Sequence, residues 1–208
     1  MRDLWLATGN DKKRAELARL LAPLGVRLRL PGELGVPFAP VEDQPDFAGN
    51  ARKKAVALAR LANGFAIADD SGLCVDALGG RPGVHSARYG GDGLDDRGRL
   101  LRLLQEIAHV DDPRRSAHFV CSLCLCGPDG RVRAAVEAHC DGVLLRAPRG
   151  SDGFGYDPAF VPRECLGEWA PRTFAELDPA RKDALSHRGK ALRVLLQRLH
   201  GEPDLLAT

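Results

Sequence analysis

Residues 65–80 read FAIADDSGLCVDALGG, and this stretch contains the central strand of the predicted fold. Its apolar beginning has the composition of a buried strand, and the run ends on two adjacent carboxylates, Asp69 and Asp70. Unpaired carboxylates are costly to remove from water. We therefore expect the strand to stop there and to present both groups to water, a lysine or a metal ion.

The segments on either side alternate between the patterns of strands and helices. Further strands are expected over residues 4–7, 26–30, 117–126 and 131–140, the last two joined as a hairpin by the turn 127–130. Helices are expected over residues 11–24, 47–62 and 100–107, after Asp178-Pro179, and from residue 187 to Gly201. The order predicts one α/β domain with a mixed sheet and flanking helices over residues 1–200, with a C-terminal tail over 201–208.

Composition excludes several classes of protein. The 208 residues are 44% hydrophobic and 28% charged, which suits a globular protein with a proper core. A net charge of +2 gives no electrostatic case for binding nucleic acid or a membrane surface. The apolar start is too short for a signal peptide, and no run approaches the roughly 18 residues that span a bilayer. Six cysteines in such a chain are expected to be reduced thiols, which predicts a cytoplasmic location.

Residues 7–17, ATGNDKKRAEL, place small and polar residues at a strand-to-helix turn. The free N–H groups of a helix start favour an anion, and lysines in the first turn are best tolerated when a negative group lies between them. A phosphate would supply that charge, although a solvated helix start is the alternative. The spacing of a Walker A loop is absent.

The sequence Asp69-Asp70-Ser71-Gly72 allows two interpretations. The aspartates either cap neighbouring N–H groups in a turn or hold Mg²⁺, which prefers carboxylate and phosphate oxygens. Glu42 and Lys54 add a further carboxylate and cation upstream. Acids that hold Mg²⁺ beside lysines that neutralise phosphate oxygens would suit a triphosphate.

Two later stretches and the cysteines each allow a functional and a structural interpretation. The glycine-rich loop 150–158 would let Phe154 stack on a base, which contributes about 1–3 kcal/mol, or anchor the ring in the core. Arg188, in a helix's first turn, needs an acceptor that is either a ligand or a surface partner. Strand alternation places Cys121 opposite Cys124 and Cys126, which favours small core residues over a zinc site.

Four stretches, taken in this order, resemble the inosine triphosphate pyrophosphatase family, which hydrolyses deaminated purine nucleoside triphosphates. They are Thr8-Gly9-Asn10 with Lys13, residues 68–91 (ADDSGLCVDALGGRPGVHSARYGG), residues 153–158 (GFGYDP), and Lys182 with residues 186–192 (SHRGKAL). The likeness runs from about residue 4 to about residue 199.

The resemblance implies two lobes around a central cleft, a homodimer, a Mg²⁺ requirement, and attack of water on the α-phosphorus to release a monophosphate and pyrophosphate. It also implies roles for particular residues. Asp70 would be the general base and a metal ligand, with Glu42 as the second ligand. Substrate contacts would come from Thr8, Gly9, Asn10, Asp11, Lys12, Lys13, Lys54 and Ser71 near the phosphates, and from Phe154, Gly155, Tyr156, Asp157, Lys182, His187 and Arg188 around the base.

The chain departs from the family's pattern at one place. The family usually reads Phe-x-Glu-Asn-Ala where this chain has Phe47-Ala48-Gly49-Asn50-Ala51, and Gln44 replaces a common glycine. The resemblance therefore supports Asp70 as a metal ligand more strongly than it supports Glu42. Two other functions remain open: a pyrophosphatase for modified pyrimidine nucleotides, and a nucleotide-binding module without catalysis, which would not need Asp70.

Overall fold

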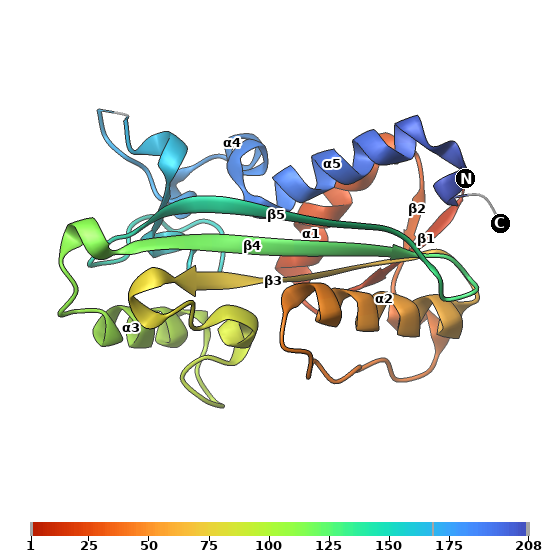
Figure 1. The fold of residues 1–208 in the computed structure, drawn as a ribbon, viewed down its shortest axis with the longest axis horizontal. Coiled ribbons are helices and arrows are strands. Elements are labelled where there is room, and N and C mark those ends of the chain that lie inside the picture. The colour runs from red at the N-terminus through yellow and green to blue at the C-terminus, as the bar shows by residue number, and fades with distance from the viewer. Residues whose placement is uncertain (1, 168, 207–208) are drawn as a thin grey trace. The chain divides into compact units, whose positions relative to one another are not determined.

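The computed structural model describes residues 2–167 and 169–206 (Figure 1). Its strands are β1 (Asp3–Ala7), β2 (Arg27–Arg29), β3 (Ala66–Val75), β4 (Ser116–Cys126), β5 (Val132–Leu144) and β6 (Phe160–Pro162). They are hydrogen-bonded in the order β2-β1-β3-β4-β5-β6. Because β1 pairs in parallel with β2 and β3, whereas β5 and β6 are antiparallel, the sheet is mixed, as the sequence predicts.

The helices also follow the sequence. They are α1 (Asp11–Leu21), α2 (Phe47–Ala62), α3 (Asp96–Glu106), α4 (Pro179–Leu185) and α5 (His187–Gly201). Helix α2 has the predicted bounds and ends on Asn63, which adopts the left-handed conformation of a C-cap with φ 45°. Within the described part of the chain, no helix is both long enough and apolar enough to cross a membrane.

Strand β3 is longer than predicted. It passes through Asp69 and Asp70 and continues to Val75, so the prediction that it stops at the carboxylates is wrong. Leu73 and Val75 are fully buried, and burying such side chains favours continuing the strand by about 1.5–3 kcal/mol each. The two carboxylates lie within the strand because nearby side chains pair with them, as described below.

The chain divides into two compact units. Unit 1 comprises the chain from its N-terminal end to Asp70, Cys121–Ala138, and Arg188 to its C-terminal end. Unit 2 comprises Ser71–Val120 and His139–His187. Part of the predicted tail belongs to unit 1, where Leu205 and Leu206 pack on its core. Residues 207 and 208 of that tail lie outside the described residues.

Unit 1 buries apolar side chains on both faces of its strands. Alternation along β1 sends Leu4 and Leu6 to one face and Trp5 and Ala7 to the other. The first face packs against leucines of α1 and α5, and the second against the small residues of α2, so helices cover both faces (Figure 1).

The cysteines of β4 follow the same alternation. Cys121 belongs to the core under α1 and α5, whereas Cys124 and Cys126 belong to the core under α2. All three are buried and none forms a disulfide. The interpretation of these cysteines as small core residues is confirmed.

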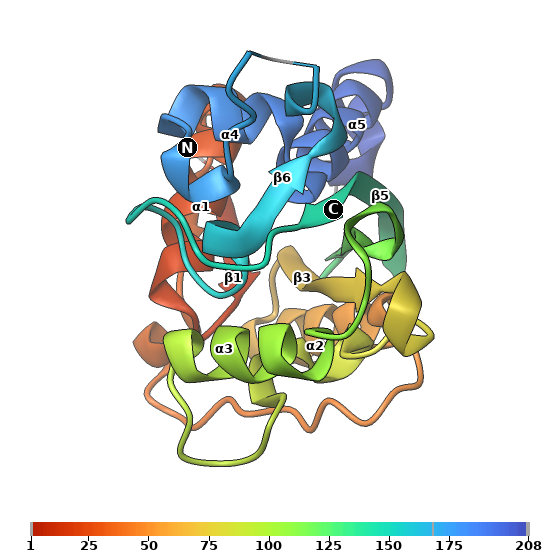
Figure 2. The ribbon, with the colours of Figure 1, turned by 90° about the vertical axis from the view of Figure 1, so that its left-hand side faces the viewer.

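Unit 2 surrounds its own core, with α3 on one side of β6 and α4 on the other (Figure 2). Arg115 is buried at 2% exposure and its guanidinium donates to three backbone carbonyls, those of Ile107, Leu144 and Leu145. These bonds tie the end of α3 to the end of β5. A capping box is also present in this unit, where Glu176 accepts from the backbone N–H of Thr173 over 2.8 Å.

Gly142 allows β5 and β6 to approach closely within unit 2. A Cβ at this position would lie 2.3 Å from the carbonyl oxygen of Val161 and 2.5 Å from the ring of Phe160. We expect Gly142→Ala to lower the free energy of unfolding by about 1–3 kcal/mol, because backbone atoms would have to shift. Urea denaturation measures the change, and Gly32→Ala, where a Cβ meets nothing within 4 Å, is the control. Equal effects of both substitutions would contradict this packing argument.

Candidate active site

Asp70 lies in unit 1 between two donors supplied by α2. Lys54 Nζ donates to Asp70 Oδ1 over 3.0 Å, and Asn50 Nδ2 donates to Asp70 Oδ2 over 3.2 Å. Lys54 Nζ also donates to Glu42 Oε1 over 2.6 Å. All except Glu42 are buried. The sequence left open whether the carboxylate faces water, a lysine or a metal, and the structure places a lysine beside it.

The pKa values of the neighbouring carboxylates Asp69 and Asp70 are shifted in opposite directions. Burial raises the pKa of Asp70, and the attraction of Lys54 does not fully offset it. Burial would also raise the pKa of Asp69, but Lys13, Arg188 and Lys54 together lower it below its ordinary value. Asp69 is thereby held ionised, while Asp70 binds a proton more readily.

Asp69 forms the centre of a buried ionic group. Arg188 donates from Nη2 to Asp69 Oδ2 over 3.2 Å and from Nη1 to Glu16, and Lys13 Nζ lies 3.5 Å from Asp69 Oδ2. Arg188 is 3% exposed, and the nearby carboxylates raise its pKa despite its burial. The acceptors that Arg188 needs at the start of a helix are therefore supplied by the protein.

The start of α1 differs from the expectation of free N–H groups. Asn10 is the N-cap, and its Oδ1 accepts from the backbone N–H groups of Lys12 and Lys13 over 3.0 Å each. Two of the donors available to an anion are thus already used. Thr8, Gly9, Asp11 and Lys12 lie at the surface or partly exposed, and Asp11 pairs with Arg14.

The aromatic loop lies in unit 2 and is organised by Asp157. Its Oδ2 accepts from the backbone N–H of Phe154 over 2.8 Å and from Lys182 Nζ over 2.8 Å. Lys182 Nζ also lies 4.9 Å from the centre of the Phe154 ring, within the range of a cation–π contact. Phe154 is only half-buried, so its ring is not anchored in the core.

Glycines are required in this loop. Gly153 has φ +72°, and a Cβ there would lie 2.3 Å from Asp157 Oδ2. Gly155 has φ +59°, also in the left-handed region. A side chain at Gly153 would displace the carboxylate that holds both Phe154 and Lys182.

Three other predicted site residues lie in unit 2. Two of them, Tyr156 and His187, contact other parts of the protein. The Tyr156 ring is 6% exposed, and its hydroxyl donates to the carbonyl of Ser86 over 2.9 Å. His187 stacks on Phe119 with ring centres 4.7 Å apart. Ser71 is partly exposed on β3. Their roles toward a substrate remain predictions.

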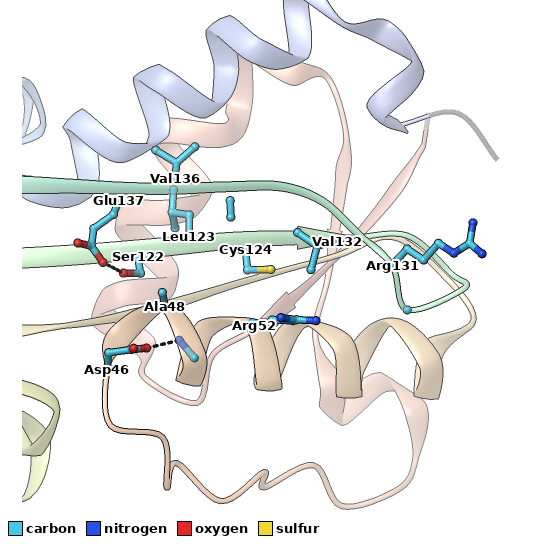
Figure 3. A pocket seen from close by; sticks show the side chains of 13 residues that line it. Asp46, Ala48, Arg52, Ser122, Leu123, Cys124, Arg131, Val132, Val136 and Glu137 are labelled. Atoms are coloured by element: carbon cyan, nitrogen blue, oxygen red, sulfur yellow. Dashed lines mark hydrogen bonds between the residues drawn. The ribbon is translucent and has the colours of Figure 1, made fainter.

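A cavity of about 830 Å³ lies elsewhere in unit 1 (Figure 3). It is lined by Asp46 and Arg52 from the region of α2 and by Ser122, Cys124 and Glu137 from β4 and β5. Ser122 donates to Glu137 at its edge, as the figure shows. None of the predicted site residues lines this cavity.

Asn50 was not singled out by the sequence. It lies four residues before Lys54 on α2, and residues at this spacing share a helix face. That spacing was one available signal, because donors one helical turn apart can reach the same carboxylate. The other was the family's pattern Phe-x-Glu-Asn-Ala, in which Asn50 occupies the Asn position.

The residues present suit a hard divalent cation. Among residues 2–167 and 169–206, no three His, Cys, Asp or Glu side chains are grouped as metal ligands. Asp70 and Glu42, however, both contact the single ammonium of Lys54, so their oxygens converge on one positive charge. Mg²⁺ is commonly held by one or two carboxylates together with substrate phosphates and water. The pair therefore fits such an ion.

Known proteins resemble the chain over nearly its whole length. The model of the Ham1 family matches residues 4–198. The dITP/XTP pyrophosphatase of Gloeobacter violaceus is 50% identical over 197 residues, covering 94% of this chain and 93% of the relative. The protein of the same name from Rhodopseudomonas palustris is 48% identical over 198 residues, covering 90% and 91%.

Solved structures agree with these relatives. A HAM1 protein from Coxiella burnetii superposes with a TM-score of 0.85 at 37% identity, covering 97% of this chain and 100% of the other. A nucleoside-triphosphatase (dITP/XTP pyrophosphatase) from Mycobacterium abscessus gives 0.74 at 41% identity, covering 95% and 99%. The predicted fold class and family are confirmed: this chain belongs to the Ham1 family.

Proposed function

We propose that this protein hydrolyses deaminated purine nucleoside triphosphates (ITP, dITP, XTP and dXTP) to the monophosphate and pyrophosphate, and so removes them from the nucleotide pool. The observation that carries the proposal is the buried Asp70 held between Lys54 and Asn50. It occurs in a chain that is 50% identical to a protein named dITP/XTP pyrophosphatase.

In this proposal Asp70 accepts the proton of the water that attacks the α-phosphorus. A general base works best when its pKa lies near the working pH, and burial raises the pKa of Asp70 in that direction. The lowered pKa of Asp69 gives that carboxylate the opposite task of staying ionised. Neighbouring carboxylates with pKa values pushed apart commonly divide such roles.

The phosphates are bound by positive groups of unit 1 in this account. Lys13 and Lys54 supply ammonium groups, and the segment Thr8–Lys12 supplies polar contacts. Asp70 and Glu42 would hold Mg²⁺. When bound, the ion would neutralise charge on the phosphate oxygens.

Recognition of the base is assigned to the aromatic loop, with Phe154 stacking on the ring and Gly155 and Asp157 shaping the loop. Lys182, His187 and Arg188 are proposed to read the edge of the base. A donor facing the 6-oxo group of hypoxanthine or xanthine would leave the 6-amino group of adenine mismatched. Such a buried mismatch can reject the wrong base by about 10⁴–10⁵-fold.

The proposed assembly follows from the resemblance, and the proposed location follows from the cysteines. We propose a homodimer that acts in the cytoplasm, with residues 1–200 serving as one catalytic domain. None of the six cysteines forms a disulfide, which suits a reducing compartment. Light scattering at several protein concentrations would test the dimer, and a monomer throughout would contradict it.

The function is tested by supplying ITP, dITP, XTP, GTP and ATP with Mg²⁺ and identifying the products. We expect IMP and pyrophosphate from ITP, and far slower hydrolysis of ATP. Orthophosphate with IDP would contradict cleavage at the α-phosphorus. Binding of ITP without turnover would favour a binding module, and preference for modified pyrimidine nucleotides would favour the other alternative.

A further inference from the structure

We propose that Asn50 is a positioning residue that fixes the orientation of the Asp70 carboxylate for proton transfer. This inference rests on the proposed function of Asp70. It adds a residue whose task is not to touch the substrate but to hold the base.

Each oxygen of Asp70 has its own donor from α2. Lys54 donates to Oδ1 and Asn50 to Oδ2, over 3.0 and 3.2 Å. Two donors on different oxygens fix the rotation of the carboxylate plane, which a single ion pair would leave free. Because the donors lie one helical turn apart, the rigidity of α2 sets their separation.

The orientation of the Asn50 amide is itself determined. The backbone N–H of Gln44 donates to Asn50 Oδ1 over 3.0 Å. Since the carbonyl oxygen is the only acceptor of an amide side chain, the NH₂ group must face Asp70. Asn50 is 1% exposed, so water does not compete for either bond.

The position of Gln44 depends on Gly49. A Cβ at residue 49 would lie 2.8 Å from Gln44 Cβ and 3.0 Å from Asp46 Oδ1. Asp46 caps α2 by accepting from the Gly49 N–H over 2.7 Å, as drawn in Figure 3. A side chain at residue 49 would therefore collide with Gln44, so the two departures from the family's pattern, Gly49 and Gln44, are coupled, and Gln44 in turn holds the Asn50 amide.

Loss of the Asn50 donor is expected to impair the chemical step rather than substrate binding. Asn50→Asp keeps the size of the side chain and its acceptor for Gln44 but removes the N–H that faces Asp70. We expect kcat for ITP to fall about 10–100-fold with KM nearly unchanged, because a misplaced catalytic group can cost about 10²-fold. Asn63→Asp is the matched control: it makes the same substitution at the exposed C-cap of α2, at the other end of the helix, so kcat should stay at the wild-type value.

A second measurement does not depend on activity or on the folding of Asn50→Asp. In the wild-type chain, NMR should show Asn50 side-chain amide protons that exchange with solvent about tenfold more slowly than in Asp70→Ala, where their acceptor is lost. Equal exchange in both proteins would overturn the proposal, as would wild-type kcat in Asn50→Asp or an equal loss of kcat in Asn63→Asp. If Asp70→Asn is inactive while Asn50→Asp is fully active, this inference fails and the proposed function stands. If the wild type hydrolyses no triphosphate, the proposed function fails and this inference fails with it.

Discussion

Asp70→Asn is expected to lower kcat for ITP hydrolysis by about 10²–10⁴-fold. An amide has nearly the same shape as a carboxylate but cannot accept the proton of the attacking water. The fold should be retained, because the amide oxygen can still accept from Lys54 or Asn50 in place of the carboxylate. Pyrophosphate release from ITP with Mg²⁺ measures the effect.

The control for this substitution is Asp43→Asn. Asp43 is an exposed carboxylate close to Glu42 in the chain and pairs with Lys53 over 2.7 Å. We expect it to keep wild-type turnover, since an exposed pair contributes little. Activity above a few per cent in Asp70→Asn, with unchanged circular dichroism, would remove Asp70 from the role of general base.

Arg188→Ala is expected to lower the free energy of unfolding by roughly 3–5 kcal/mol. Arg188 is 3% exposed and donates to both Asp69 and Glu16, which are also buried. Its removal would leave two carboxylates out of water with much of their compensating charge gone. Equilibrium urea denaturation at neutral pH measures the change.

Arg27→Ala is the control for the loss of stability expected in Arg188→Ala. Arg27 donates to Asp3 through two nitrogens, but its side chain is 60% exposed, so its removal should cost no more than about 1 kcal/mol. Similar losses in both variants would contradict the importance of burial. The same Arg188→Ala protein tests base reading: an equal fall in ITP and ATP turnover would exclude Arg188 from that role.

Local patterns predicted most elements of the fold. The bounds of α2 follow from small residues on one face and from Asn63 at its end, and the hairpin of β4 and β5 follows from alternation and a glycine-rich turn. The end of β3 could not be predicted in this way. Asp69 and Asp70 look like a strand end in isolation, and only their distant partners make them compatible with its interior.

The sequence identified several residues of the candidate site but not the contacts that they make. The sequence identified Lys54, Asp70 and Arg188, but it could not show that Arg188 is paired within the protein by Asp69 and Glu16, because Glu16 lies 172 residues away. Asn50 was missed for a similar reason. Its importance depends on which residue of β3 faces α2, and tertiary packing decides that.

The central claim is that Asp70 faces the α-phosphorus of a bound triphosphate together with a magnesium ion. A crystal structure with Mg²⁺ and an ITP analogue that resists hydrolysis between its α- and β-phosphates tests it most directly. We expect the cation about 2.0–2.1 Å from a carboxylate oxygen of Asp70 or Glu42, and a water between Asp70 and the α-phosphorus. A nucleotide bound away from Asp70, or a phosphate chain beside it without a cation, would contradict the account.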